Sequence, residues 1–128
     1  PRSVRMSDDA IPAATLIVMR DVASGPPELL MVRRTQRMAF AGGAMVFPGG
    51  RIDAGDFALG SDHESAARVA AIRETIEETG LPVALSAPRN LQQQLHAGED
   101  FGSLLQREGI VLDLDSLVPF ARWRPAFH

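Results

Sequence analysis

The sequence predicts one α/β domain, a mixed and twisted sheet flanked by helices, and two features of the chain support this fold class. Between residues 13 and 47, short runs of β-branched and apolar residues are separated by glycine and proline, a pattern typical of strands. The segment 61–79 carries apolar residues at helical spacing and is followed by Gly80, which is typical of a helix and its end. A chain of 128 residues is long enough to bury the core of a single domain without disulfides.

The composition narrows the expected compartment and partners. Cysteine is absent, which is compatible with a reducing compartment, and we expect a cytoplasmic protein. The net charge of −3 gives no reason to expect a nucleic-acid or anionic-membrane partner. No apolar run approaches the ~18 residues that a membrane span needs. All 13 basic side chains are arginine, so a bound anion would meet planar guanidinium groups that can donate two hydrogen bonds at once.

Residues 1–11 show no periodicity and are expected to form a lead-in arm. Three strands are expected after this arm, at residues 13–20, 28–34 and 44–47. The turn-forming sequence at residues 25–27 separates the first two strands, which would pair as a hairpin. Residues 35–43 contain two glycines and suit a loop that lies over a ligand.

The segment before the long helix is expected to be irregular. Gly49 and Gly50 permit positive φ or a close approach of the backbone to a ligand. Residues 51–60 show no helical period and are expected to form a loop. Ser61 then fits the N-cap of the long helix, and Glu64, three residues later, would complete a capping box.

The last part of the chain is expected to be mostly helical. Residues 81–85 would lead away from the long helix in an extended conformation. Two short helices are expected at residues 89–96 and 100–108, and Gly109 would end the second one. Residues 114–123 are expected to be a loop that leads into a strand.

Three glutamates at the end of the long helix are the main candidates for chemistry. Glu74, Glu77 and Glu78 stand at i, i+3 and i+4, so their carboxylates share one helix face and repel each other. They also crowd the C-terminal end of the helix, where the macrodipole favours cations. Arg73 can reach Glu77 at i+4, but one guanidinium group cannot neutralise three carboxylates. The spacing therefore favours a divalent cation held by oxygen ligands.

Two parts of the chain resemble the two halves of the Nudix box, whose pattern is G-x5-E-x7-R-E-U-x-E-E-x-G-U. They are Phe-Pro-Gly-Gly at residues 47–50 and Arg-Glu-Thr-Ile-Glu-Glu-Thr-Gly at residues 73–80. The second half matches except that Thr75 replaces a large aliphatic residue. The interval from Gly50 to Arg73 is nine residues longer than in the pattern.

The longer interval leaves the first acidic residue of the box open. Asp56 has the required spacing from Gly50, whereas Glu64 lies next to the position found by counting back from Arg73. Glu64 could instead stabilise its own helix by pairing with Arg68 at i+4. Asp56 could be an ordinary loop residue or a metal ligand.

The lengthened box is similar to that of the Nudix branch that includes the coenzyme A diphosphatases. Residues 30–50 partly follow the coenzyme A signature of this branch, L-L-T-x-R-S/A-x3-R-x3-G-x3-F-P-G-G. Arg34, Gly43 and the final four residues match. Ala39 replaces an arginine of the signature, which Arg37 could supply only after a shift of register.

The resemblance implies metal-dependent hydrolysis of a diphosphate that links a nucleoside to another group, with Mg²⁺ or Mn²⁺ as the cofactor. The implied metal ligands are Glu74, Glu77 and Glu78. The implied catalytic residues are Glu78, Glu77, and Arg73 as the partner that orients a box carboxylate. In the family the general base is either a box glutamate or an acid of a later loop; Glu78 is the first expectation, and the later acids are Glu99, Asp100, Asp113 and Asp115. Contacts to the diphosphate or a 3′-phosphate would come from Arg34, Arg37, Arg51 and the backbone N–H groups of Gly49 and Gly50.

The expected partner is a small nucleotide, and coenzyme A or an acyl derivative is the first expectation. ADP-ribose and NADH are the alternative substrates. A module that senses a nucleotide without cleaving it is the alternative from another functional class. Such modules commonly lose box carboxylates, whereas this sequence keeps all three, which favours the enzyme.

The sequence also suggests that part of the domain is missing from this chain. Only 48 residues follow Gly80, whereas the resemblance implies further strands and a closing helix after the box. We therefore expect that a longer chain, a swapped segment or a partner chain, as in a homodimer, completes the sheet.

Overall fold

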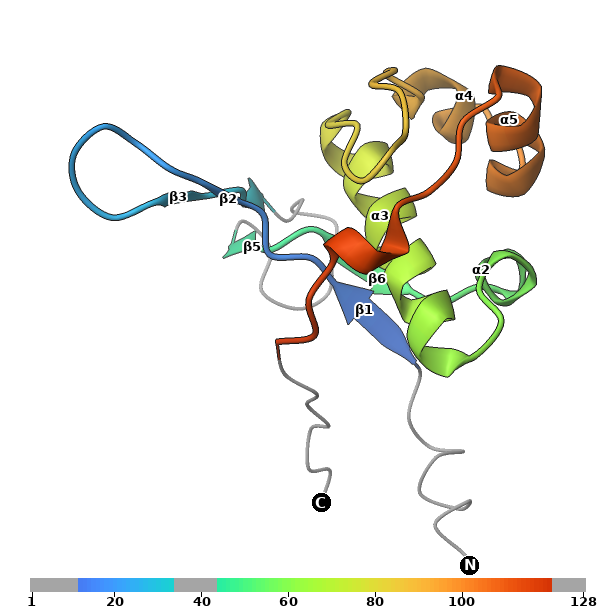
Figure 1. Ribbon diagram of the computed structural model, residues 1–128, viewed down its shortest axis with the longest axis horizontal. Helices are drawn as coiled ribbons and strands as arrows, with labels where there is room; N and C mark the ends of the chain where they lie inside the picture. Colours follow the sequence, from blue (N-terminus) through green and yellow to red (C-terminus); the bar gives the residue numbers. More distant parts are fainter. Residues whose placement is uncertain (1–11, 34–43, 121–128) are drawn as a thin grey trace, which may run out of the picture.

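The computed structural model describes residues 12–33 and 44–120, and Figure 1 shows their arrangement around one long central helix. The elements, in chain order, are β1 (Ala13–Thr15), β2 (Met19–Arg20), β3 (Glu28–Leu29), β4 (Val32–Arg33), β5 (Met45–Val46), β6 (Gly49–Arg51), α2 (Ala54–Leu59), α3 (His63–Thr79), α4 (Gln92–His96), α5 (Phe101–Glu108) and the 3₁₀ helix η1 (Leu114–Ser116). Helix α3 contacts β1, β6, α2, α4 and η1. The α/β class expected from the sequence is confirmed.

The strands pair in three antiparallel ladders of two strands each within the described part of the chain. These ladders join β1 with β6, β2 with β3, and β4 with β5. The predicted hairpin is confirmed by the pairing of Met19 with Leu29, and it extends away from the helices in Figure 1. The first predicted strand, residues 13–20, is interrupted at residues 16–18, and the second, residues 28–34, at residues 30–31.

Strand β6 was not expected, because glycine has a low β propensity. It forms because glycine permits a very close approach to β1. A Cβ atom added to Gly49 would lie 2.3 Å from the carbonyl oxygen of Ala14. Gly49 and Gly50 are not among the glycines with positive φ, so of the two expected alternatives the structure shows the close approach, which is made to protein atoms.

Helix α2 corrects the prediction of a loop at residues 51–60. It begins after Asp53, whose backbone N–H donates to Oδ2 of Asp56 at 2.7 Å. Asp53 is the N-cap and Asp56 the N3 residue, so this hydrogen bond, from the N-cap N–H to the N3 side chain, is one of the two that define a capping box. This local pattern could have revealed the helix.

Helix α3 has the predicted end and a start one residue later than predicted. Asp62 is the N-cap in place of Ser61, and its side chain accepts a hydrogen bond from the N–H of Ser65 at 2.8 Å. This hydrogen bond lowers the pKa of Asp62. The predicted pair of Glu64 with Arg68 is present at 3.1 Å. Gly80 ends the helix with φ of 78°, as predicted.

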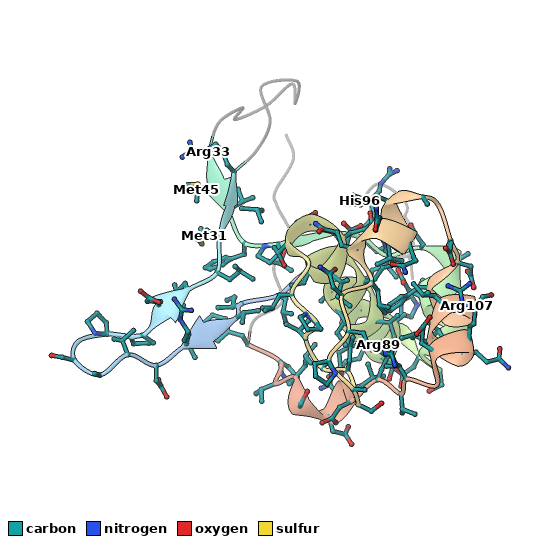
Figure 2. The ribbon with its side chains drawn as sticks, turned by 90° about the horizontal axis from the view of Figure 1, so that it is seen from above. Met31, Arg33, Met45, Arg89, His96 and Arg107 are labelled. Atoms are coloured by element: carbon teal, nitrogen blue, oxygen red, sulfur yellow. The ribbon has the colours of Figure 1, made fainter. Side chains whose placement is uncertain are left out.

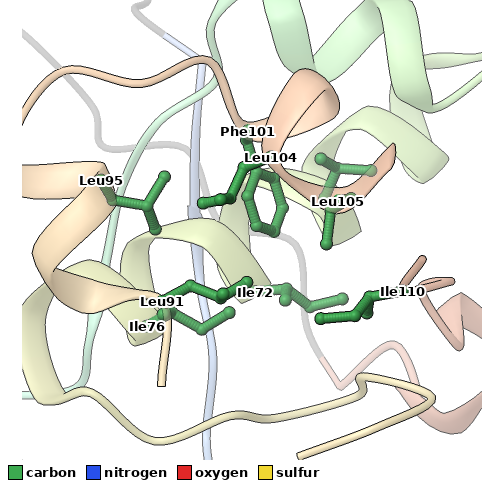
Figure 3. Packing of buried hydrophobic residues seen from close by; sticks show 9 residues of the cluster. Ile72, Ile76, Leu91, Leu95, Phe101, Leu104, Leu105 and Ile110 are labelled. Atoms are coloured by element: carbon green, nitrogen blue, oxygen red, sulfur yellow. The ribbon is translucent and has the colours of Figure 1, made fainter. Parts of the chain in front are cut away.

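The hydrophobic core lies between α3 and the two short helices α4 and α5 (Figure 3). It consists of Val69, Ile72, Ile76, Leu91, Leu95, Phe101, Leu104, Leu105 and Ile110. Burying an aliphatic side chain of this size contributes about 1.5–3 kcal/mol, so this cluster fixes one face of α3. Both short helices were predicted, although α4 begins three residues later than expected, at Gln92.

Two predictions for the last part of the chain are wrong. Residues 81–85 form no strand, and Leu85 makes a single β-bridge with Leu112. Ala84 has a positive φ of 56°, which interrupts an extended conformation. The expected strand within residues 114–123 is absent from its described part, which begins with η1, and residues 121–123 lie outside the described residues.

Across residues 12–33 and 44–120, no helix combines the length and apolar character that crossing a bilayer requires.

Candidate functional site

The candidate site lies on the face of α3 that is turned away from the hydrophobic core. Strand β6 and helix α2 pack against this helix. The exposed fraction of the side chain is 18% for Glu74 and 33% for Glu77, and Glu78 is exposed. Glu74, Glu77 and Glu78 therefore form an acidic face on the last two turns of α3, with carboxylates that range from half-buried to exposed.

Arg73 is the centre of an ion-pair network beneath these carboxylates. Its guanidinium group binds Asp56 through two hydrogen bonds, Nε to Oδ1 at 3.0 Å and Nη2 to Oδ2 at 2.9 Å. Its Nη1 donates to Oε2 of Glu74 and to Oε2 of Glu77, both at 3.2 Å. Nη2 also donates to the carbonyl oxygen of Arg51 at 3.1 Å. The expected pairing of Arg73 with a box carboxylate is present, and the network is wider than expected.

The surroundings of Arg73 keep it charged. Burial alone would lower the pKa of Arg73, but the hydrogen bonds and charge of Asp56, with the charges of Glu74 and Asp53, raise it overall. Asp53 contributes an ion pair at 3.3 Å. A permanently charged guanidinium group in this position holds two carboxylates of α3 at fixed places.

Asp56, and not Glu64, is the acidic residue that contacts Arg73. Asp56 is only 1% exposed, and both of its carboxylate oxygens are bonded to Arg73. Glu64 lies at the start of α3, where its side chain is 55% exposed and pairs with Arg68. The role of Asp56 as the anchor of Arg73 was missed from sequence, where its spacing from Gly50 made it one of two candidates for the first acidic residue of the box.

Gly50 provides the space that the Glu74 carboxylate occupies. A Cβ atom at Gly50 would lie 2.5 Å from Cδ and 2.6 Å from Oε2 of Glu74. Burial raises the pKa of Glu74 to about 7, opposed by the charge of Arg73 and reinforced by Glu77 and by a hydrogen bond with Glu78. The carboxyl groups of Glu74 and Glu78 thus lie close together, which marks a position that suits a cation.

The backbone N–H of Gly49 makes a hydrogen bond between β6 and the acidic face. Hydrogen bonds from Leu16 N–H to the Pro48 carbonyl and from Ile52 N–H to the Pro12 carbonyl continue the β1–β6 pairing beyond its two ends. The alternation of an antiparallel ladder turns the N–H of Gly49 away from β1. It donates to Oε1 of Glu78 at 3.3 Å. A contact of this N–H group with a phosphate stays a prediction.

The arginines expected to contact phosphate are described only in part. Arg34 and Arg37 lie outside the described residues, as does Gly43. Arg51 is exposed at the end of β6, and its carbonyl oxygen belongs to the Arg73 network. The side chain of Arg51 is therefore exposed to solvent.

A cavity of about 200 Å³ lies beside Arg73 and Glu77, between α2 and the segment from Leu95 to Gly102. The carboxylates in its lining belong to Asp53, Asp56, Glu77, Glu99 and Asp100. The negative charge of this lining opposes the entry of an anionic diphosphate. The cavity is therefore a poor candidate for the diphosphate site.

The donor set on α3 fits a hard divalent cation. No three acidic or histidine side chains converge into a preassembled metal cage within residues 12–33 and 44–120. Mg²⁺ is commonly bound by one or two carboxylates together with water and substrate phosphate oxygens. Glu74 and Glu78 match this requirement, because their carboxyl groups lie together and Glu78 is open to solvent.

Comparison with known proteins agrees with this geometry. The family model described as NUDIX domain matches residues 10–112. A solved structure described as a NUDIX hydrolase from Alicyclobacillus acidocaldarius is similar to this chain, with a TM-score of 0.72 and 33% sequence identity. The similarity covers 81% of this chain and 57% of that hydrolase, so this chain spans little more than half of its length. A comparison with curated proteins found no significant match.

Proposed function

Because the chain belongs to the NUDIX domain family, we propose that it is a Nudix hydrolase that cleaves the diphosphate linkage of a nucleoside diphosphate derivative with Mg²⁺ or Mn²⁺. The observation that carries this proposal is the placement of Glu74. Its carboxyl group lies between Arg73 and Gly50 and beside Glu78, with a pKa raised by burial. A half-buried carboxyl group that is costly to ionise in the free protein is well suited to a cation.

The acidic face supplies the metal ligands in this proposal. Glu74 and Glu78 are the first ligands, and Glu77 binds directly or through water. When bound, the cation would neutralise charge on the diphosphate and orient the attacking water. Arg73 keeps Glu74 and Glu77 at fixed places, since one Nη1 group contacts both carboxylates. Asp56, in the place of the first acidic residue of the box, holds Arg73.

Glu78 is the proposed general base. It is the most accessible carboxylate of the three, and its contact with Gly49 places it next to β6. A base must reach the water from which it takes a proton, so accessibility favours Glu78 over the half-buried Glu74. The water oxygen forms a bond with phosphorus, the bridging P–O bond breaks, and Glu78 accepts the proton of the water.

Coenzyme A or an acyl-coenzyme A is the proposed substrate, with a phosphopantetheine compound and adenosine 3′,5′-bisphosphate as products. The partial signature at Arg34, Gly43 and residues 47–50 supports this choice. The exposed side chain of Arg51 at the end of β6 offers a further contact for a phosphate.

The proposal is tested by incubating the chain with coenzyme A, dephospho-coenzyme A, acetyl-coenzyme A, ADP-ribose and NADH, each with Mg²⁺ or Mn²⁺, and identifying the products by mass. Faster cleavage of coenzyme A than of dephospho-coenzyme A supports recognition of the 3′-phosphate. Preferred cleavage of ADP-ribose or NADH would contradict coenzyme A as the substrate and would still support hydrolysis of a diphosphate linkage. Calorimetric binding of a nucleotide without any product overturns the hydrolase and supports a sensor.

A further inference from the structure

Two side chains of α4 converge on one backbone carbonyl in the last turn of α3. Gln92 Nε2 donates to the carbonyl oxygen of Glu77 at 3.0 Å, and His96 Nε2 lies 2.6 Å from the same oxygen. Figure 2 shows His96 on α4, beside the end of α3. Because a carbonyl oxygen can only accept, His96 must carry its proton on Nε2.

This carbonyl has lost its partner within the helix. The last four carbonyls of an α-helix lack an i+4 donor. The N–H of Gly80 bonds the carbonyl of Ile76, and the N–H of Leu81 donates to Oγ1 of Thr79, so neither serves Glu77. Gln92 and His96 therefore supply the donors at the negative end of the helix dipole, next to the carboxylates of the acidic face.

The core holds α4 rigidly in this place. Leu91 and Leu95 directly precede Gln92 and His96 and are only 2% and 7% exposed. Their side chains pack in the hydrophobic cluster with residues of α3 (Figure 3). The two donors therefore lie on a helix whose position the core holds in place.

The exit of α3 is shaped to accept Gln92. A Cβ atom at Gly80 would lie 3.0 Å from Oε1 of Gln92 and 3.5 Å from the side-chain amide of Asn90. Gly80 thus ends the helix and also leaves room for the amide that binds the Glu77 carbonyl.

We propose that Gln92 and His96 are positioning residues for the metal-binding carboxylates and act through the peptide group between Glu77 and Glu78. This inference rests on the proposed function of the acidic face. The carbonyl of Glu77 belongs to the peptide that joins the two glutamates. Fixing this peptide fixes the directions in which the side chains of Glu77 and Glu78 leave the backbone. Loss of residues that orient metal ligands without touching the metal commonly changes metal affinity or activity 10- to 100-fold.

The test compares variants of α4 by their affinity for Mn²⁺, measured from the electron paramagnetic resonance signal of the free ion. Gln92→Met and His96→Leu remove the donors and keep similar side-chain size. Gln93→Met, at an exposed position of the same helix, is the matched control. His96→Gln restores an N–H donor and serves as the conservative variant.

We expect the Gln92→Met, His96→Leu double variant to bind Mn²⁺ about 10-fold more weakly or worse. Gln93→Met should bind Mn²⁺ as tightly as the wild type does. His96→Gln should bind Mn²⁺ more tightly than His96→Leu, because it restores an N–H donor. Melting temperatures in EDTA should differ little between the double variant and Gln93→Met. Unchanged Mn²⁺ affinity in the double variant overturns the inference, as does a wild-type chain that binds no Mn²⁺.

Turnover separates this inference from the proposed function. With a substrate that the chain cleaves, the double variant should lower kcat and leave KM nearly unchanged, because neither side chain belongs to the proposed substrate contacts. If the wild type cleaves no diphosphate but binds Mn²⁺, the proposed function fails, and the Mn²⁺ affinities of the variants still decide the positioning role.

Discussion

Asp56 and Arg73 form a two-fold hydrogen-bonded ion pair between α2 and α3, with N···O distances of 3.0 and 2.9 Å. Both groups are largely removed from water, since the side chains of Asp56 and Arg73 are 2% and 10% exposed. The pair connects α2 to the helix that carries the acidic face. Its loss should therefore affect stability and the placement of Glu74 and Glu77 together.

Replacing Asp56 with alanine removes two hydrogen bonds and one negative charge from the buried guanidinium group of Arg73. Removal of one partner of a buried ion pair typically costs about 3–5 kcal/mol. Because Glu74 and Glu77 remain beside Arg73, we expect the lower end of this range for Asp56→Ala. Urea unfolding of the metal-free protein gives the change in the free energy of unfolding.

Glu64→Ala is the matched control for Asp56→Ala, because Glu64 is the other acidic candidate in the box. Its pair with Arg68 is exposed and lies at i+4 on one helix, so its loss should cost only about 0.3–0.5 kcal/mol. Equal losses in the two variants would contradict the anchoring role of Asp56.

How far the sequence predicts the site depends on how local each contact is. The helix end at Gly80 and the cluster of three glutamates follow from spacing within one helix, and both were predicted. The role of Asp56 depends on an insertion that changes the spacing to Arg73, so counting along the sequence could not decide between Asp56 and Glu64. The approach of β6 to β1 and the contacts of α4 with Glu77 depend on tertiary packing, which no local pattern reveals.

The box glutamates should each be needed for turnover. Removing the base of a proton transfer lowers rates by about 10²–10⁴-fold, so Glu78→Gln should lose nearly all activity. Glu74→Gln and Glu77→Gln should also lose most of it, because a neutral amide is a weaker ligand for a hard cation. Steady-state kinetics with Mg²⁺ measure these losses, and Glu64→Gln is the control that should keep full activity. Unchanged turnover in all three variants would refute the catalytic assignment.

The pKa of Glu74 predicts how the metal-free protein responds to pH. Burial raises this pKa from 4.5 to about 7, so the folded state holds more protons than the unfolded state between these values. The contribution of Glu74 to stability is complete below pH 4.5 and is lost as the pH rises through 7. Urea unfolding in EDTA should therefore show that wild type loses stability between pH 5 and pH 8 relative to Glu74→Gln. Parallel pH profiles for the two proteins would be evidence against the raised pKa.

Metal binding should compete with the proton on Glu74. The carboxylate must ionise before it binds a cation, so binding releases a proton when the pKa lies near the working pH. We expect the Mn²⁺ affinity to fall as the pH drops below 7, by at most about tenfold per pH unit for one displaced proton. Calorimetry at pH 7 in buffers of different ionisation enthalpy measures the released protons directly. A release of zero would show that Glu74 is already ionised or is not a ligand.

Gly49 and Gly50 should respond differently to alanine, although they are neighbours in β6. A Cβ atom at Gly49 would meet backbone atoms of β1, at 2.3 Å from the Ala14 carbonyl oxygen and 2.7 Å from Cα of Thr15. Backbone atoms of a paired strand cannot move aside without breaking the ladder, so Gly49→Ala should lower the melting temperature strongly.

A Cβ atom at Gly50 would instead meet the end of the Glu74 side chain, at 2.5 Å from Cδ. That side chain can rotate away, so Gly50→Ala should keep most of the stability while displacing a metal ligand. Melting temperature in EDTA and Mn²⁺ affinity, measured on both variants, separate the two effects. If Gly50→Ala binds Mn²⁺ as tightly as wild type, then the position of Glu74 against β6 is not required for metal binding.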